Sequence, residues 1–207
     1  MNKIAAMKRS SDARDRLLGA ADTLFRDRGF SAIGVAEICS IADVNKGSFY
    51  HFFPSKRALL VEVVESAWDE TGMLAAWETT PPQHPVEQLR KFLKELFAVH
   101  YADKESHGSV RGSLLSNISH EVATSDTEIT DKLTDLFKRE TSAFESLLTA
   151  AVDRGEVSVG NPRSAAEALV GCVHGQIMLA KVRNDLSVLP QSETDIFRLA
   201  VVIQQWL

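Results

Sequence analysis

The sequence predicts an all-α protein of about nine helices, in which a three-helix domain containing a helix-turn-helix precedes a larger helical bundle. Apolar residues recur at helical spacing almost throughout the 207 residues, and no segment alternates as a strand would. With 44% hydrophobic and 25% charged residues, the composition is that of an ordinary globular chain. No apolar stretch approaches 18 residues, so we expect no membrane-spanning helix and no membrane partner.

Turn and capping residues divide the first part of the chain into four predicted helices. The first begins at Ser10 or Ser11, which suit an N-cap, and ends at Gly29. Two short helices with a four-residue turn between them follow, and then a longer helix that Pro81 cannot continue. These three helices are predicted at 35–41, 46–52 and about 56–76.

The second part of the chain is predicted to form a helical bundle. Asn161 and Pro162 mark its clearest helix start, since they place an N-cap before a proline in the first turn. The predicted helices lie at about 86–101, 112–123, 126–154, 162–182 and 192–207, with a polar loop at 102–111. The predicted domains are residues 1–55 and 77–207, joined by the linking helix at about 56–76.

Opposite charges separate along the chain, although its net charge is only −5. Residues 1–60 hold ten Lys or Arg against six Asp or Glu, a local charge of +4, and the other 147 residues carry −9. This division is typical of a basic contact module for nucleic acid that is attached to an acidic body.

The sequence lacks the patterns that carry catalysis or hold metals. Cys39 and Cys172 lie far apart and in no metal-ligand spacing, which is typical of a reducing cytoplasm. There is no phosphate-binding glycine loop, no HExxH and no GxSxG motif. We therefore expect a cytoplasmic protein that is not an enzyme and holds no metal or cofactor. Cys39 is expected to be a small buried residue rather than a redox sensor.

The strongest signal is the helix pair within residues 35–56, whose lengths and turn fit a helix-turn-helix. Ile38 and Ile41 are predicted to face inward from its first helix, while Phe49 and Phe53 anchor the second. The second helix then turns outward a set of donors, a cation and aromatic polar groups, as base edges and phosphates require. The set is Asn45, Lys46, Ser48, Tyr50 and His51, with Gly47 where backbone amides approach a phosphate and Lys56 as a further phosphate cation. From these residues alone, a three-helix packing unit with an exposed polar face is as good an interpretation as DNA binding.

The same segment resembles a known family. Its motif is KGSFYHFFPSK at residues 46–56, together with Gly29, Phe30, Ile38, Ala42, Val44 and Leu59. Over roughly residues 12–68, the chain resembles the tetracycline-repressor (TetR/AcrR) family of bacterial transcriptional regulators. The resemblance implies a homodimer with an amino-terminal domain for double-stranded operator DNA and a carboxy-terminal domain that senses a ligand and dimerises. It also implies that Asn45, Lys46, Ser48, Tyr50 and His51 touch DNA, with Tyr50 and Lys56 mainly on phosphate.

Two positions depart from the family pattern. Asp43 stands in the turn where the family often has glycine, and we expect it to adopt a left-handed conformation at a small cost in stability. Gly34 stands where Ser or Thr is common, so it caps the first helix of the motif without a hydroxyl for a phosphate. Neither change overturns the resemblance.

The predicted carboxy-terminal domain would hold the ligand, and polar or aromatic residues at helical spacing are its candidates. Any one of the apolar candidates is more often ordinary packing in a filled bundle core. Ser113 stands where some family members have cysteine in a GxLxxNxxxE segment, so we expect a reversible, non-covalent small-molecule effector. The candidates are Trp77, Phe97, His100, Tyr101, Asn117, His120, Phe144, His174 and Met178.

The last two predicted helices are the expected dimer seam. Gly171 and Gly175 permit close helix approach, and the terminal helix is apolar to the end of the sequence. The expected interface residues are Gly171, Cys172, Gly175, Leu199, Ile203 and Trp206.

Together these patterns predict a ligand-responsive, DNA-binding transcriptional regulator, with a repressor released from a palindromic operator as the main hypothesis. The second helix of each motif would occupy one major groove, with centres roughly 34–36 Å apart. One alternative is an activator or protein-interaction regulator of the same fold without a small ligand. Another is a helical ligand carrier or enzyme whose first domain is only structural.

Overall fold

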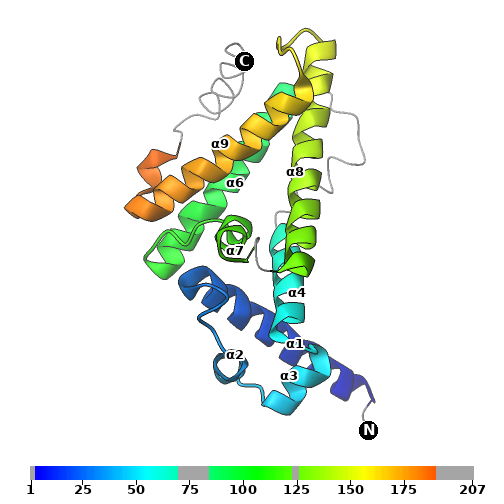
Figure 1. The fold of residues 1–207 in the computed structure, drawn as a ribbon, viewed down its shortest axis with the longest axis vertical. Coiled ribbons are helices and arrows are strands. Elements are labelled where there is room, and N and C mark those ends of the chain that lie inside the picture. Colours follow the sequence, from blue (N-terminus) through cyan, green and yellow to red (C-terminus); the bar gives the residue numbers. More distant parts are fainter. Residues whose placement is uncertain (1–2, 70–83, 123–125, 190–207) are drawn as a thin grey trace. The chain divides into compact units, whose positions relative to one another are not determined.

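The computed structural model describes residues 3–69, 84–122 and 126–189, and within them the side chains of all but residues 3–11 and 69. Every regular element in these ranges is helical, which confirms the predicted all-α class. The elements are α1 (Lys3–Arg28), α2 (Val35–Ile41), α3 (Lys46–Phe52), α4 (Lys56–Asp69), α6 (Pro85–His107), α7 (Leu114–Val122), α8 (Thr127–Asp153), α9 (Pro162–Arg183) and the 3-10 turn η1 (Leu186–Val188) (Figure 1). Within the same ranges, no helix is both long and apolar enough to cross a membrane.

The two short helices, α2 and α3, have the bounds predicted from the sequence. α1 instead begins at Lys3 rather than at Ser10 or Ser11, because the intervening Ala, Met, Lys and Arg residues are strong helix formers. α6 continues through part of the predicted polar loop to His107. It ends at Gly108, whose φ of 74° forms a left-handed C-cap.

The start of α9 is also as predicted. The side-chain oxygen of Asn161 accepts a hydrogen bond from the N–H of Ser164 at 3.1 Å, and Pro162 opens the helix. The predicted helix at 192–207 and the predicted linking helix beyond Asp69 lie outside the described residues.

The chain forms two compact units, of which the first consists of residues 1–70 and 114–133. In this unit α1 packs against α2, α3 and α4, and α7 packs against α1 and α4 (Figure 1). Phe25, Phe49 and Phe53 are fully buried there. The helix-turn-helix therefore belongs to the same compact unit as α7, a helix from much later in the sequence.

The inward face of α2 carries Ile38, Cys39 and Ala42, which are all buried. The prediction that Ile41 also faces inward is wrong, because its side chain is 62% exposed. Ala42 follows Ile38 by four residues, about one helical turn, and so takes the inward position instead. Cys39 is buried, as expected.

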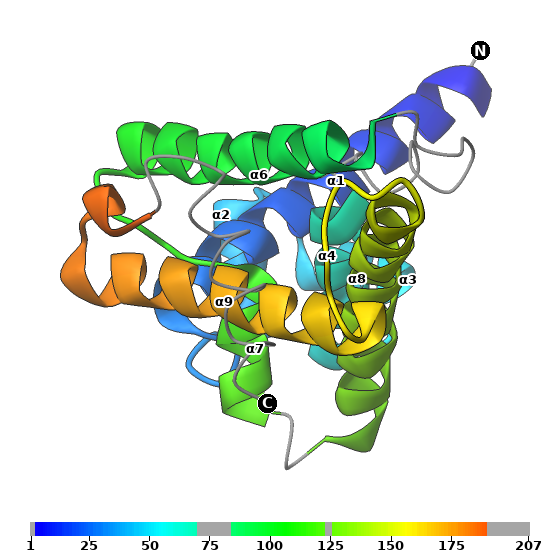
Figure 2. The ribbon, with the colours of Figure 1, turned by 90° about the horizontal axis from the view of Figure 1, so that it is seen from above.

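The second unit consists of residues 71–113 and 134–207, and its described part contains α6, most of α8, α9 and η1. Its core is built between the three long helices, with Leu93, Phe144 and Leu169 fully buried. Figure 2 shows η1, in dark orange, beside the ends of α6 and α9. There the hydroxyl of Tyr101 on α6 donates to the carbonyl of Leu186 at 3.2 Å.

Ile38 and Ile41 offer a matched test of the core around α2. Replacing Ile38 by alanine removes a fully buried side chain and is expected to lower the unfolding free energy by about 2–5 kcal/mol. Replacing the exposed Ile41 by alanine is expected to change it by less than about 0.5 kcal/mol. Urea unfolding followed by circular dichroism measures both values. Equal losses in the two variants would contradict the observed orientation of α2.

Candidate nucleic-acid interface

The seven-residue helix α3 is fixed at its start by Asn45 and along its inner side by phenylalanine. The Oδ1 atom of Asn45 accepts a hydrogen bond from the N–H of Ser48 at 2.8 Å, which caps the helix. Phe49 is fully buried, and its ring centroid lies 5.9 Å from that of Phe53 and 5.2 Å from that of Tyr50. These contacts determine which face of α3 remains open to solvent.

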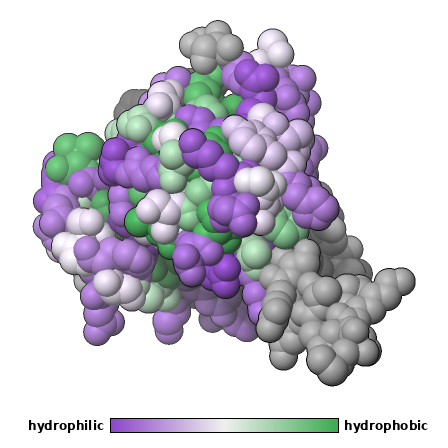
Figure 3. Space-filling model, turned by 90° about the horizontal axis from the view of Figure 1, so that it is seen from below, coloured by the Kyte–Doolittle hydropathy of each residue, from purple (hydrophilic) through white to green (hydrophobic). Residues whose placement is uncertain are grey.

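The residues predicted to contact DNA lie together on α3 and at its start, and most are exposed. Asn45, Lys46, Gly47, Tyr50 and His51 are exposed and Ser48 is half-buried, with 57% of Tyr50 accessible. Figure 3 views the molecule from the side on which α2 and α3 lie in Figure 1, and hydrophilic side chains predominate on this face.

Gly47 has a local role in addition to the one expected of it. A Cβ atom at this position would lie 3.2 Å from Oδ1 of Asn45, which is tighter than an ordinary contact. The absence of a side chain at residue 47 thus leaves room for the Asn45 cap of α3.

The turn between α2 and α3 is held from α1. Asp43 has a φ of 50°, the left-handed conformation expected there. Arg16 on α1 donates from Nε to the carbonyl of Ala42 at 2.9 Å and from Nη2 to that of Asp43 at 3.3 Å. This contact could not be predicted from the sequence, because Arg16 has the pattern of an ordinary exposed residue of an amphipathic helix. Gly34 caps α2 without a side-chain hydrogen bond, as expected.

Lys56, the first residue of α4, makes contacts within the first unit. Its ammonium group donates to the carbonyl of Phe30 at 2.8 Å and to that of Ile33 at 2.7 Å. It also lies 4.1 Å from the centroid of the Phe30 ring, a cation–π contact. Two of its three donors are therefore used inside the first unit.

Glu121 on α7 reaches the same segment from the other side. Its carboxylate accepts hydrogen bonds from the N–H of Phe30 at 2.8 Å and from the N–H of Ser31. Gly29 makes this approach possible, because its φ is 83° and an added Cβ would lie only 2.9 Å from Oε2 of Glu121. Glu121 is the last residue of the GxLxxNxxxE segment noted in the sequence, but no role was predicted for it, because nothing local signals a partner 91 residues away.

The electrostatics of this contact favour the ionised carboxylate. Desolvation, the largest single influence, raises the pKa of Glu121, but hydrogen bonds from Ser31 and Phe30 and the charge of Lys56 together bring the pKa below its usual value. Desolvation lowers the pKa of Lys56, while the charge of Glu121 acts in the opposite direction. The two side chains stabilise each other's charged forms.

Comparison with known proteins agrees with this geometry. Residues 17–63, which contain α2 and α3, match the family described as "Bacterial regulatory proteins, tetR family". The chain belongs to the TetR family. Members of this family are helix-turn-helix transcriptional regulators that bind operator DNA and act as dimers.

Two curated relatives match most of the chain. It is 26% identical over 188 residues to the HTH-type transcriptional repressor NemR of Escherichia coli K12, covering 86% of this chain and 88% of NemR. It is 24% identical over 185 residues to the HTH-type transcriptional repressor DhaR of Mycobacterium sp. GP1, covering 89% and 90%. Among solved structures, the regulatory protein TetR from Rhodobacter sphaeroides has a TM-score of 0.77 at 26% identity, covering 90% of this chain and 97% of that one.

The predicted ligand-binding residues of this TetR-family chain are divided between the two units. Asn117 and His120 lie on α7 of the first unit, where His120 is exposed and its Nδ1 lies 2.6 Å from the carbonyl oxygen of Ser116. In the second unit, Phe97, His100 and Phe144 are buried, His174 is half-buried, and Tyr101 and Met178 are exposed. Trp77 lies outside the described residues. These residues do not gather in one compact unit.

A polar pair lies within the second unit. Glu140 on α8 is 5% exposed, and its Oε2 lies 3.0 Å from Nε2 of His174 on α9. The ring of Phe137 meets the imidazole edge-on, with centroids 5.2 Å apart. His174 was predicted from the sequence as a ligand-binding candidate and Glu140 was not, because a glutamate on a long amphipathic helix usually faces solvent.

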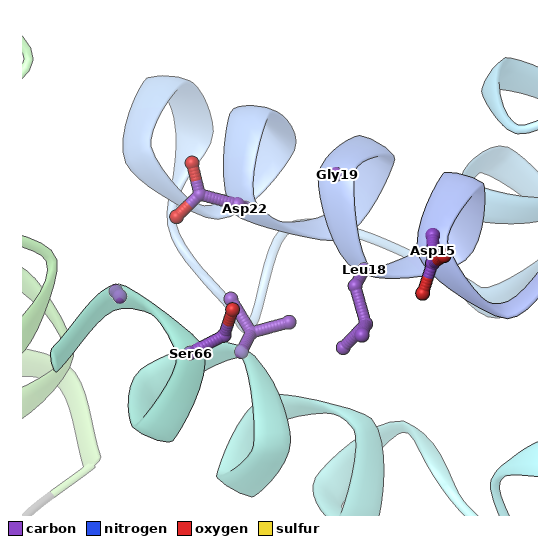
Figure 4. A pocket seen from close by; sticks show the side chains of 7 residues that line it. Asp15, Leu18, Gly19, Asp22 and Ser66 are labelled. Atoms are coloured by element: carbon purple, nitrogen blue, oxygen red, sulfur yellow. The ribbon is translucent and has the colours of Figure 1, made fainter. Parts of the chain in front are cut away.

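An open pocket of about 320 Å³ lies in the first unit, between α1 and α4 (Figure 4). Leu18 points into it from α1 and Ser66 lies on the α4 side, as Figure 4 shows. The described residues that line it are Asp15, Leu18, Gly19, Asp22, Val63, Ser66 and Ala67, and they include none of the predicted ligand-binding residues.

Of the predicted dimer residues, the structure describes the three on α9. Gly171 is exposed, and Cys172 and Gly175 are half-buried. Burial raises the pKa of the Cys172 thiol, as it does that of Cys39, where the charge of Lys46 partly opposes the effect. Leu199, Ile203 and Trp206 lie outside the described residues.

Replacing Lys56 by methionine keeps an unbranched apolar side chain of similar reach but leaves the carbonyls of Phe30 and Ile33 without their ammonium donor. The expected cost is about 1–3 kcal/mol of unfolding free energy, because these groups lose charge-assisted hydrogen bonds. The matched control is Lys46→Met, an exposed lysine of the same unit, with an expected change below about 0.5 kcal/mol. Chemical denaturation of both variants provides the comparison, and an unchanged Lys56→Met protein would refute the structural role of this ammonium group.

Proposed function

We propose that this protein is a dimeric transcriptional repressor that binds a near-palindromic operator through α3 and releases it when a small molecule binds. The observation that carries the proposal is the division of α3 into two faces. Phe49 is fully buried on one face, and Lys46, Tyr50 and His51 are exposed on the other. A helix of this kind fits the major groove with its polar side chains toward base edges and phosphates.

The exposed side chains suit different parts of the duplex. Lys46 and the hydroxyl of Tyr50 suit phosphate oxygens, which accept from cations and neutral donors. His51 and the amide nitrogen of Asn45 offer donors to base edges, while Oδ1 of Asn45 caps the helix. Lys56 is held by two carbonyl groups, so its main role in this proposal is to organise the segment that leads into α2.

The proposed domains follow the division predicted from the sequence. Residues 1–55 bind DNA, the helix predicted at 56–76 links them to the body, and residues 77–207 carry the effector and dimer sites. In this arrangement the effector binds better to a conformation in which the two α3 helices of the dimer have a spacing that does not match the operator. DNA affinity then falls by the ratio of the effector's affinities for the two states.

The effector is proposed to be a reversible ligand of the second unit, in a protein that works in the cytoplasm. Ser113 supplies a hydroxyl where a thiol would be needed for covalent sensing. The Glu140–His174 pair provides a buried polar anchor to which a ligand with a hydrogen-bond donor can bind. The relatives NemR and DhaR are transcriptional repressors, which favours a repressor over an activator.

The proposed dimer seam includes one face of α9. Along this helix, small or apolar residues repeat at steps of three and four, which places them on one stripe. Val182 is 77% exposed, Met178 is 44% exposed and Leu179 is 38% exposed. The stripe consists of Gly171, Cys172, Gly175, Met178, Leu179 and Val182. A second copy of the chain would cover it.

Lys46→Ala tests the DNA contact. We expect the affinity for DNA fragments from the protein's own promoter region to fall about tenfold at low salt, and the slope of log affinity against log salt to decrease by about one. The matched control is Lys91→Ala, an exposed lysine of α6 in the second unit, which is expected to change neither value. Mobility-shift titration over a range of salt concentrations measures both. Absent or salt-insensitive binding by the unaltered protein would contradict the proposed function.

Val182→Asp tests the dimer seam. A carboxylate on the α9 stripe would have to be buried against the partner, so we expect the variant to sediment as a monomer at concentrations where the original protein is a dimer. Val99→Asp on α6 is the control, since Val99 is also exposed, at 57%, and lies outside the proposed seam. If Val182→Asp remains a dimer, α9 is not the seam.

A further inference from the structure

In the α1–α2 loop, residues 29–34, both N–H groups and carbonyl groups form hydrogen bonds with charged side chains from later helices. Glu121 of α7 accepts hydrogen bonds from the N–H groups of Phe30 and Ser31. Lys56 of α4 donates to the carbonyl oxygens of Phe30 and Ile33. Four backbone groups of one short loop therefore have charged partners, and such hydrogen bonds are roughly twice as strong as neutral ones.

This loop determines where the helix-turn-helix begins. Ile33 is almost fully buried, and the carbonyl of Gly34 accepts the first hydrogen bonds of α2, from Glu37 at 3.0 Å and Ile38 at 3.2 Å. A displacement of the loop therefore displaces the start of α2. α3 must follow, because only a four-residue turn, held by Arg16, connects the two helices.

The charge of Glu121 works against the proposed DNA contact. A carboxylate in a DNA-binding unit repels phosphate, so general electrostatics predicts that its removal strengthens binding. Its geometry indicates that Glu121 instead strengthens DNA binding, because it holds the loop that leads into α2 and α3. The two effects differ in sign, so an experiment can separate them.

We propose that Glu121 is a positioning residue: through its bonds to the α1–α2 loop, α7 sets the orientation of α2 and α3 and thereby the affinity for DNA. This inference rests on the proposed DNA-binding function. α7 also packs against α1 and α4. A movement of α7 can therefore displace α2 and α3 through the α1–α2 loop as well as through α4. By linkage, any event that draws α7 from the loop weakens DNA binding, and bound DNA holds α7 in place.

The test replaces Glu121 by glutamine in the full-length chain. Fluorescence anisotropy with a labelled fragment of the protein's own promoter region is expected to show about five- to twenty-fold weaker binding, at a temperature where circular dichroism reports a folded protein. The matched control is Glu65→Gln on α4, which makes the same chemical change at an ion pair with Lys132 in the same unit. We expect its affinity to stay within about twofold of the original, or to rise slightly.

Hydrogen exchange provides a readout that needs no DNA. In Glu121→Gln, we expect amide exchange to quicken about tenfold at Phe30 and Ser31 and also in α2, because both depend on the loop. Glu65→Gln should leave these amides unchanged. If Glu121→Gln does not fold, Glu121→Asp replaces it, since aspartate keeps the charge but withdraws the carboxylate by one methylene group. The same losses are expected of it.

Two results would overturn the inference. One is DNA binding by the glutamine variant that is as tight as, or tighter than, that of the original protein. The other is faster exchange confined to Phe30 and Ser31, with α2 unaffected. If the original protein binds no fragment, the proposed function fails, and exchange in α2 alone then decides for or against the positioning role.

Discussion

Burial of the aromatic inner side of α3 is the constraint on which the DNA-binding unit depends. Phe49 and Phe53 are both fully buried and lie in ring contact, and α3 is only seven residues long. A helix so short gains little stability from its own hydrogen bonds, so tertiary packing has to hold it in place. Because these two rings are buried, the polar residues between them, Tyr50 and His51, face solvent.

The sequence was informative where the physics is local. Caps, turn residues and apolar spacing predicted the bounds of α2 and α3, because these depend on neighbours a few residues away. The left-handed Asp43 was expected from the family resemblance, since the family often has glycine at this turn position. Local reasoning failed at Ile41, since Ala42 competes for the inward position on the next turn and periodicity cannot rank two adjacent apolar residues. It also failed at the start of α1, where good helix formers precede the serines that suit a cap.

The contacts that organise the interface were not predictable in the same way. Arg16, Lys56 and Glu121 each bind backbone groups between 23 and 91 residues away. Backbone acceptors and donors have no residue type, so no pattern of side chains announces them. A charged residue with such a partner has the same sequence signature as one that faces water. Whether the candidate effector residues form one site could not be predicted either. Helical spacing assigns residues to a face of their own helix, but it does not show which helix faces pack together.

The discontinuous first unit has a consequence for how regulators of this kind can be recombined. α7 lies after α6 in the chain, yet it packs with α1 and α4 and carries the acceptor for the α1–α2 loop. A chimaera joined after α4 would combine helices α1 to α4 of one parent with the α7 of another. Residue 29 must also match α7, since any side chain larger than that of glycine would crowd the carboxylate of Glu121. Grafting operator specificity onto a new sensor therefore means exchanging two separate stretches of sequence as one piece.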